Sequence, residues 1–429
     1  MKTFLKRIRI GTWSAVLVLG LAAVVCCGAQ FIAPVIEVAN PPNAAEQQSK
    51  PYVVLVSLDG FRYDYARKYG AKNLLAMAKR GASAPDGMIP SYPSVTFPNH
   101  TSIATGLYPE HHGIVANSFY DPERKENYDF SNPKSDTDGS WYGGTPLWVL
   151  AEKQGMRAAC FFWPGSEAEI QGKRPSYYLA YDDKFPDEKR VEQIMAWLWL
   201  PPQQRPHLIT LYYSNTDHAG HAYGPEAAET AEAVGHVDEM IGKLAEGIAA
   251  TGLNVDLIVV ADHGMETVQG SGVTLDQWAD LSQVITSGPL LYASSEADAE
   301  RVYRSLLGKS DKFKVYRRAD VPAHLHYNAN PREGDPVVVP TGPYIIVAHA
   351  PSSAVSLPRG NHGYDPRQMP SMKAIFYAAG PDIRAGVTVA PFENVDLYPF
   401  IAKILDLRIG PIDGNLKSLQ KVLNRSAQN

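Results

Sequence analysis

Residues 51–60 read PYVVLVSLDG, and this stretch decides the fold. Its apolar run, 53–58, ends at Asp59 and Gly60. A short apolar run that is closed by a turn signal is typical of a strand buried on both faces of a parallel sheet. The stretch therefore predicts a buried parallel strand that ends in a carboxylate.

Two later segments repeat this form. Residues 207–213 (HLITLYY) lead to Asp217, and residues 255–261 (VDLIVVA) lead to Asp262. We expect further strands at 156–163, 343–349 and 373–378. Helical patterns separate these segments, at 73–80, 190–200 and 225–250.

The helix expected at 225–250 has the clearest period. Its apolar residues fall at steps of three and four: Val234, Val237, Ile241, Leu244 and Ile248. Strands that alternate with helices predict an α/β fold, with a mostly parallel sheet flanked by helices on both faces. Residues 270–345 are rich in turn residues, which predicts a small α+β insertion and not a separate domain.

The N-terminus has the features of a targeting segment. Basic residues (Lys2, Lys6, Arg7 and Arg9) precede an apolar run from Ile10 to Cys27. We expect residues 1–30 to be a signal peptide or an N-terminal membrane anchor. In both cases the rest of the chain is expected to be exported, to the periplasm or out of the cell. If the segment is not cleaved, it would anchor the protein to the inner membrane. Residues 31–50 read as a linker, 51–420 as the catalytic domain and 421–429 as a C-terminal tail.

Composition narrows the classes of function. The chain has 429 residues, is 45% hydrophobic and carries a net charge of −5, which suits a large core and argues against nucleic acid as a partner. Cys26 and Cys27 lie in the targeting segment, so Cys160 is alone in the folded part and is expected to be a buried structural residue.

Three apolar strands end in a carboxylate: Asp59, Asp217 and Asp262. A single aspartate after a strand is usually a helix cap or a turn residue. Two of these three also have a nearby histidine, His221 and His263. Carboxylates with imidazoles suit Zn²⁺ or Mn²⁺, and ligands gather at the carboxyl ends of parallel strands. The set predicts a two-metal site of the kind used in phosphoryl transfer.

Residues 91–106, SYPSVTFPNHTSIATG, carry a hydroxyl that could serve this site. Thr96 stands at or just before a helix start, with Pro98 in the first turn. Two interpretations are open: Thr96 is the helix N-cap, or it is a metal-activated nucleophile that attacks a phosphate held at the helix N-terminus.

Longer motifs follow one another in a specific order: VSLDGFR, PSVTFPNHTSIATGLYPEHHGIVANSFYDP, WPGSEAEIQGKRP, TDHAGHAYGP, ADHGM and NHGYDP. Over residues 52–418 the chain resembles the nucleotide pyrophosphatase/phosphodiesterase family of the alkaline phosphatase superfamily, as an exported member of bacterial type. The resemblance implies an alkaline-phosphatase-like fold and two Zn²⁺ per chain, with Mn²⁺ as the alternative metal.

The resemblance also assigns residues. It makes Thr96 the nucleophile and Asn117 a ligand of a phosphate oxygen. It assigns one zinc to Asp59, Thr96, Asp262 and His263, and the other to Asp217, His221 and His362. Phe97 is expected on one side of a nucleotide base, and a tyrosine after WPGSE on the other, for which Tyr177, Tyr178 and Tyr181 are candidates and Tyr181 is preferred.

The expected activity is hydrolysis of nucleotide phosphodiesters and pyrophosphates to nucleoside 5′-monophosphates through a phospho-threonine. Four alternatives are weighed. A lysophospholipid or choline phosphodiesterase and a phosphomonoesterase would share the metals. A sulfatase is disfavoured, because YPSVTF lacks the Cys and the Arg that it needs. A non-catalytic exported binding protein would be expected to have lost a metal ligand, and none is missing.

Overall fold

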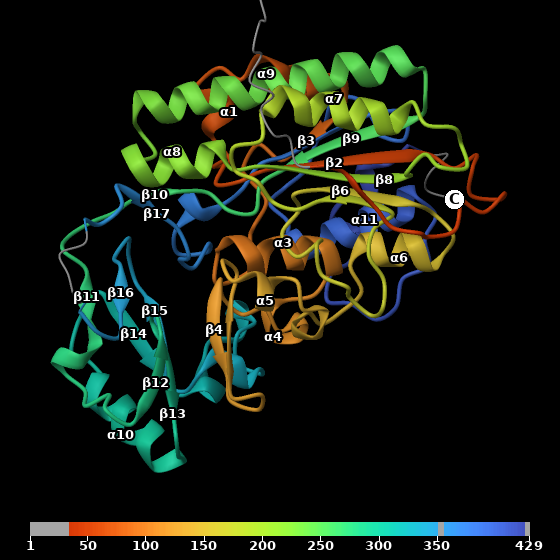
Figure 1. Cartoon of the computed structure of the whole chain (residues 1–429). Helices are drawn as coiled ribbons and strands as arrows, with labels where there is room; N and C mark the ends of the chain where they lie inside the picture. Colours follow the sequence, from red (N-terminus) through yellow and green to blue (C-terminus); the bar gives the residue numbers. More distant parts are fainter. Residues whose placement is uncertain (1–33, 351–355, 425–429) are drawn as a thin grey trace, which may run out of the picture. The chain divides into compact units, whose positions relative to one another are not determined.

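A nine-stranded sheet organises residues 34–350 and 356–424, which are the residues that the computed structural model describes (Figure 1). In spatial order its strands are β1 (Ile36–Glu37), β7 (Tyr177–Leu179), β6 (Ala158–Phe161), β8 (Leu208–Tyr213), β2 (Tyr52–Leu58), β9 (Val255–Val260), β18 (Phe376–Ala379), β3 (Ala82–Ser83) and β19 (Val387–Thr388). The five strands from β7 to β9 run parallel, and β1 and β18 join them antiparallel.

Strand β2 lies at the centre, and all seven of its residues are buried. Its last residues stand beside the ends of both neighbours: Leu58 faces Tyr213 on β8, and Ser57 faces Val260 on β9. The sequence prediction of three buried parallel strands is therefore confirmed. The same register brings the three carboxyl ends to one edge of the sheet.

Helices cover both faces of the sheet (Figure 1). On one side lie α1 (Tyr65–Lys68), α7 (Asp187–Leu198), α8 (Asn215–Tyr223) and α9 (Ala228–Thr251); on the other lie α3 (Thr96–Thr105), α6 (Leu147–Lys153) and α11 (Leu397–Ile404). Helix α2 (Lys72–Arg80) packs against α9. The five apolar residues predicted to line one face of α9 are all buried. The predicted fold class is confirmed.

Residues 273–347 form the small α+β insertion. Its elements are β11 (Val273–Thr274), β12 (Val284–Ser287), β13 (Leu290–Ala293), α10 (Glu296–Leu306), β14 (Phe313–Tyr316), β15 (Val337–Pro340) and β16 (Ile346–Val347). They have a core of their own around Val302 and Leu306, which are fully buried. The strand expected at 343–349 shrinks to the two residues of β16, which pair with β11 and not with the central sheet. Pro343 has no backbone N–H to donate, and the Tyr344 N–H bonds to Gly342 in a tight turn.

The shorter elements lie outside the nine-stranded sheet. They are α4 (Pro109–His112), β4 (Ser118–Asp121), β5 (Glu126–Asp129), α5 (Pro133–Asp136), β10 (Glu266–Thr267) and β17 (Gly360–Asn361). Strands β4 and β5 form a hairpin, and β10 pairs with β17.

Two predicted boundaries differ from the structure. Residues 34–50, expected to be a linker, pack on the domain: the buried Asn43 side chain donates to two carbonyls, of Pro202 and Arg205, at 2.7 Å. The predicted tail begins inside the fold, because Val422 is fully buried and accepts a hydrogen bond from the Arg384 N–H. Both segments satisfy their backbone groups on the domain, which composition alone does not reveal.

In residues 34–350 and 356–424, no helix combines the length and the apolar character that a membrane span needs. The predicted signal peptide or anchor lies outside the described residues.

Candidate metal centre and nucleophile

Three buried aspartates meet at the carboxyl edge of the sheet. Asp59 directly follows β2, Asp262 comes two residues after β9, and Asp217 lies in the first turn of α8. The turn after Asp59 needs glycine: Gly60 has φ of +66°, and a Cβ there would lie 2.9 Å from the Cα of Asp217. Its N–H donates to Asp262 Oδ1 over 3.2 Å, so the turn ties the three strand ends together.

The first group of side chains that could hold a metal ion is Asp59, Asp262 and His263. All three are buried, and one ligand atom from each lies within 4.8 Å of the others. His263 Nε2 is 3.0 Å from Asp262 Oδ2 and 3.5 Å from Asp59 Oδ1. Thr96 Oγ lies 3.5 Å from the same nitrogen, so the threonine hydroxyl borders this group.

The second group is Asp217, His221 and His362, and its two histidines are partly exposed. Asp217 Oδ1 is 3.4 Å from His221 Nε2 and 3.5 Å from His362 Nε2. The two imidazoles approach to 3.1 Å between their Nε2 atoms. The ring of His362 also stacks on His263, with centroids 3.6 Å apart, so the two groups are neighbours.

The three histidines of the two groups are oriented alike. In each, Nδ1 lies within hydrogen-bond distance of a backbone carbonyl: His263 with Gly264 at 2.9 Å, His221 with Gly360 at 2.8 Å and His362 with Ser94 at 2.9 Å. A carbonyl can only accept, so Nδ1 carries a proton, and Nε2 is the nitrogen that faces the centre. Metal-binding histidines are commonly held in this way.

The carboxylates of the centre lack enough protein partners of their own. Within the described residues, Asp59 Oδ1, Asp217 Oδ1 and Asp262 Oδ2 are buried without a hydrogen bond. Burial, and then the charges of the other two aspartates, raise the pKa of Asp59 well above its usual value. Burial also raises the pKa of Asp217. Buried carboxylates that repel one another and lie beside imidazole Nε2 atoms fit divalent cations with oxygen and nitrogen ligands, such as Zn²⁺.

Thr96 is the first residue of α3. The N-cap is Val95, with no side chain capping the helix, so the interpretation of Thr96 as the cap is wrong. Its hydroxyl instead points to His263, as the distance above requires. The Phe97 N–H in this first turn donates to Asn117 Oδ1 over 2.9 Å. That bond leaves the two N–H donors of the Asn117 amide for another acceptor.

The aromatic residues expected to hold a base do not contact each other. Phe97 is only 9% exposed and packs on Phe130, with ring centroids 5.3 Å apart. Tyr181 is 47% exposed, lies 6.1 Å from the Tyr212 ring, and donates its hydroxyl to Asp183. Phe130 is 44% exposed, and nothing in the sequence around it marked it as part of the site.

Residues that support the centre were only partly foreseen. The Tyr212 hydroxyl donates to Asp59 Oδ2 over 2.5 Å, a contact that the apolar strand pattern of 207–213 hides. His100 is fully buried between Ser57 Oγ at 2.8 Å and the Thr96 carbonyl at 2.9 Å. The His218 side chain, one residue after Asp217, is more than half exposed and faces Asp183.

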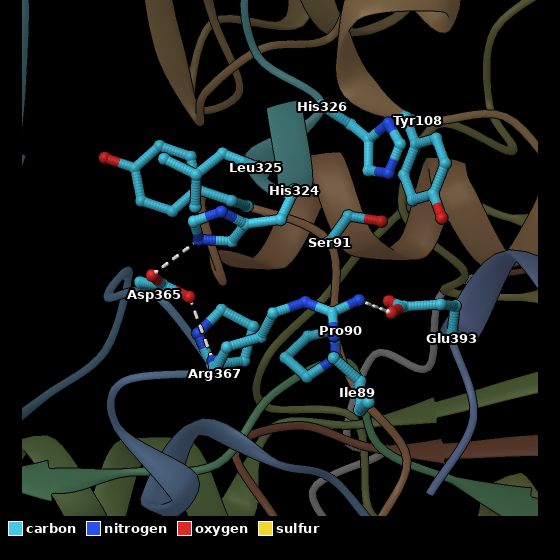
Figure 2. A pocket seen from close by; sticks show the side chains of 12 residues that line it. Ile89, Pro90, Ser91, Tyr108, His324, Leu325, His326, Asp365, Arg367 and Glu393 are labelled. Atoms are coloured by element: carbon cyan, nitrogen blue, oxygen red, sulfur yellow. Dashed lines mark hydrogen bonds and ion pairs between the residues drawn. The ribbon is translucent and has the colours of Figure 1, made fainter. Parts of the chain in front are cut away.

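A separate small hollow is lined by none of the residues of these two groups. Figure 2 shows that its polar side chains pair with one another: His324 with Asp365 over 3.1 Å, and Arg367 with Glu393. Its volume of about 10 Å³ corresponds to roughly one water molecule. It therefore offers no room for a phosphate ester.

Comparison with known proteins agrees with this geometry. A model of the type I phosphodiesterase/nucleotide pyrophosphatase family matches residues 53–365. An uncharacterized pyrophosphatase/phosphodiesterase of Schizosaccharomyces pombe is 37% identical over 84% of this chain and 78% of its own length. Human ectonucleotide pyrophosphatase/phosphodiesterase family member 1 is 35% identical over 90% of this chain, which spans only 43% of the human protein.

Solved structures of the same family resemble this chain. Murine ectonucleotide pyrophosphatase/phosphodiesterase 5, in an inactive variant in complex with AMP, superposes with a TM-score of 0.81 and 29% identity, over 87% of this chain and all of that one. The resemblance inferred from the motifs is thus confirmed, and this chain belongs to the type I phosphodiesterase/nucleotide pyrophosphatase family.

Proposed function

We propose that this protein is a two-zinc phosphodiesterase and nucleotide pyrophosphatase that forms a phospho-threonine at Thr96 and releases nucleoside 5′-monophosphates. One observation carries the proposal: the Thr96 hydroxyl lies at the start of α3, 3.5 Å from His263 Nε2, beside two adjoining groups that could hold metals. The names of the relatives support the reaction class. The AMP bound to the murine protein, whose inactive variant has a threonine replaced by alanine, supports the substrate and the nucleophile.

The metal ligands follow from the two groups. One zinc would be held by Asp59, Thr96, Asp262 and His263, and the other by Asp217, His221 and His362, with Mn²⁺ as the alternative ion. When bound, the ions offset the carboxylate charge, favour the ionised hydroxyl and stabilise negative charge on phosphoryl oxygens.

The side chains then carry out a double displacement. Thr96 Oγ attacks phosphorus, and the bond from phosphorus to the leaving oxygen breaks on the opposite side. The amide nitrogen of Asn117 donates to a phosphoryl oxygen, and the N-terminal end of α3 favours the same negative charge. Water then cleaves the phospho-threonine and restores the Thr96 hydroxyl.

The charge of the site favours a diester. Two divalent cations would balance three carboxylates and one alkoxide, which leaves a near-neutral site for a singly charged phosphate diester. In the described residues, the carboxylates of Asp59, Asp217 and Asp262 lie within 3.5 Å of histidine nitrogens and pair with no Lys or Arg. A phosphomonoester, which is doubly charged, would need an extra cation.

We further assign the nucleoside to the aromatic side of Thr96. Phe97 supports Phe130, whose exposed face could contact a base, and Tyr181 is exposed near Tyr212. Stacking on a base contributes roughly 1–3 kcal/mol, so Tyr181→Ala should lower kcat/KM for a nucleotide diester by about one to two orders of magnitude. Tyr178→Ala, in the same segment, is the control. Equal losses for the two variants would remove Tyr181 from the base site.

Export is the proposed destination. It rests on the basic and apolar N-terminal segment. It also fits relatives that are named as an ectonucleotide enzyme and as venom phosphodiesterases.

The test is a substrate panel with the purified holoenzyme: a nucleotide diester, ATP, a lysophospholipid and an alkyl phosphomonoester. In ¹⁸O water, the nucleotide diester should give nucleoside 5′-monophosphate that carries the label. Faster turnover of the monoester would place the protein with the phosphomonoesterases, and faster turnover of the lysophospholipid would place it with the lipid phosphodiesterases.

A further inference from the structure

A cavity of about 370 Å³ opens beside the metal centre. One wall comes from the segment that leads into α3, with Tyr92 and Val95, and from the segment 361–364. The opposite wall belongs to the insertion, with Leu290 at the start of β13 and residues 344–346. The size lies in the range of sites for small molecules.

Several contacts fix the walls in place. Tyr327, which is almost fully buried, donates its hydroxyl to the Val115 carbonyl over 3.1 Å and packs edge-on against Tyr92. Ser287 Oγ, at the end of β12, donates to the Ser118 carbonyl over 3.1 Å. The insertion is therefore joined to residues 115–118, which lead into β4, and residues 116–118 line the cavity.

The lining is apolar and aromatic. It is built mainly from Val, Ile, Leu, Pro and Tyr side chains, and none of the described residues that line it is a Lys, Arg, Asp or Glu. An anionic group such as pyrophosphate would lose its hydration here without gaining a Lys or Arg as a partner. A neutral group with an apolar part would gain from leaving water.

The position of the cavity indicates which substituent of the phosphodiester it would contact. Asn117 and His362 line it, whereas Phe97, Phe130 and Tyr181 do not. A phosphodiester carries two substituents on phosphorus, and the aromatic residues are assigned to the nucleoside. The other substituent is the leaving group. The cavity borders the centre at His362, which belongs to the second group of possible metal ligands. Thr96 instead borders the first group, at His263.

We infer that this cavity binds the leaving group, and that it selects neutral alcohols with an aryl or alkyl part over pyrophosphate. The inference rests on the proposed function and adds a substrate class to it. As the bond from Thr96 Oγ to phosphorus forms, the bond to the leaving oxygen breaks. The alcohol takes a proton from solvent and departs through the cavity.

The test uses the zinc-loaded full chain and three esters of thymidine 5′-monophosphate: methyl, octyl and 2-phenylethyl. Their leaving alcohols are primary and of similar acidity, so a difference in kcat/KM reports binding. We expect octyl or 2-phenylethyl to exceed methyl by about tenfold or more, since each buried methylene contributes a factor of about four. A larger gain in kcat/KM for the octyl ester would indicate an alkyl site, and a larger gain for the 2-phenylethyl ester an aromatic site.

Leu290→Lys tests the cavity itself. Leu290 is partly buried and lines it, and the variant should abolish the advantage of the long esters and raise the rate on ATP relative to them. Ile285→Lys is the matched control, because Ile285 lies on the same hairpin, is 47% exposed and does not line the cavity. Ile345→Lys, at a second position of the same wall, repeats the test if Leu290→Lys melts early.

Two results would overturn the inference: wild-type rates on the three esters within twofold of each other, or an ester preference that survives both lysine variants. In either case hydrolysis of the methyl ester would continue, and the proposed function would stand. Failure to hydrolyse any of the three esters would instead reject the proposed function.

Discussion

Strand β9 carries a buried aspartate near each end, and the two have opposite surroundings. Asp262, past its carboxyl end, lies among imidazoles: burial would raise its pKa, but His263 and His100 outweigh that and lower it. Asp256, near its amino end, has Asp382 for a neighbour, and burial together with that negative charge raises its pKa to about 7. Each has one buried carboxylate oxygen without a hydrogen bond in the described residues.

The two aspartates show that the same buried residue type can be protonated at one end of a strand and charged at the other. At the amino end, a proton compensates for burying the carboxyl group. At the carboxyl end the negative charge is kept, and imidazoles and, as we propose, cations compensate for it. Burial alone therefore does not mark a functional aspartate; the groups that face it do.

The largest expected effect is at the carboxyl end. Asp262→Asn keeps the shape of the side chain and removes its charge, so one metal should bind poorly. We expect kcat/KM for a nucleotide diester to fall by at least about three orders of magnitude, roughly 4 kcal/mol, together with loss of bound zinc in elemental analysis. A variant that keeps its zinc and more than a tenth of the wild-type rate would contradict the metal assignment.

The matching change at the amino end should leave activity alone and alter stability. The pKa of Asp256 is about 7 in the folded protein, against about 3.9 in an unfolded chain. The folded state therefore binds more protons between these values, and stability falls as pH rises from about 4 to about 7. Asp256→Asn escapes this loss, and should be more stable than wild type at pH 8 by up to about 4 kcal/mol, with no such gain at pH 4.

Denaturant unfolding at the two pH values measures this. The control is Asp238→Asn, because Asp238 accepts from the Asn73 and Leu74 N–H groups and its replacement should destabilise. Equal stability changes for Asp256→Asn at pH 4 and pH 8 would mean that Asp256 does not titrate in this range.

A smaller effect is expected from a residue that supports the centre. Tyr212→Phe removes the 2.5 Å hydrogen bond to Asp59 and should weaken metal binding about 10- to 100-fold, as measured by competition with a chelator. Tyr213→Phe is the neighbouring control, since the Tyr213 hydroxyl makes only a 3.5 Å contact with the Asp187 carbonyl. Indistinguishable zinc affinities for the two variants would show that the Tyr212 bond does not tune the site.

The sequence alone predicts the sheet well where burial and period act together. The run 53–58 and the stripe in α9 are predicted correctly because every residue in them faces the core. The structures of segments 343–349 and 34–50 are not predicted correctly, because their strands pair with partners far along the chain.

Some residues of the candidate site are likewise predictable from the sequence, and others are not. Asp59, Asp217 and Asp262 follow strands, so topology predicts their meeting. His362 lies in a loop beside β17 and reaches the centre through its bond to Ser94; only resemblance to a family selects it. Phe130 and Tyr212 are invisible in the sequence because their roles arise from contacts across the fold.

The central claim is that Thr96 is the nucleophile, and kcat of Thr96→Ala tests it most directly. Thr96 does not cap its helix, so the variant should fold, and its melting temperature should stay close to that of wild type. Thr101→Ala is the control, because it removes a hydroxyl from the same helix that bonds only to the Phe97 carbonyl. We expect a fall in kcat of three or more orders of magnitude for Thr96→Ala, roughly 4 kcal/mol, partial activity for Thr96→Ser, and little loss of activity for Thr101→Ala. A Thr96→Ala protein that retains more than about a tenth of the wild-type kcat, less than about 1.4 kcal/mol of barrier, would contradict this claim.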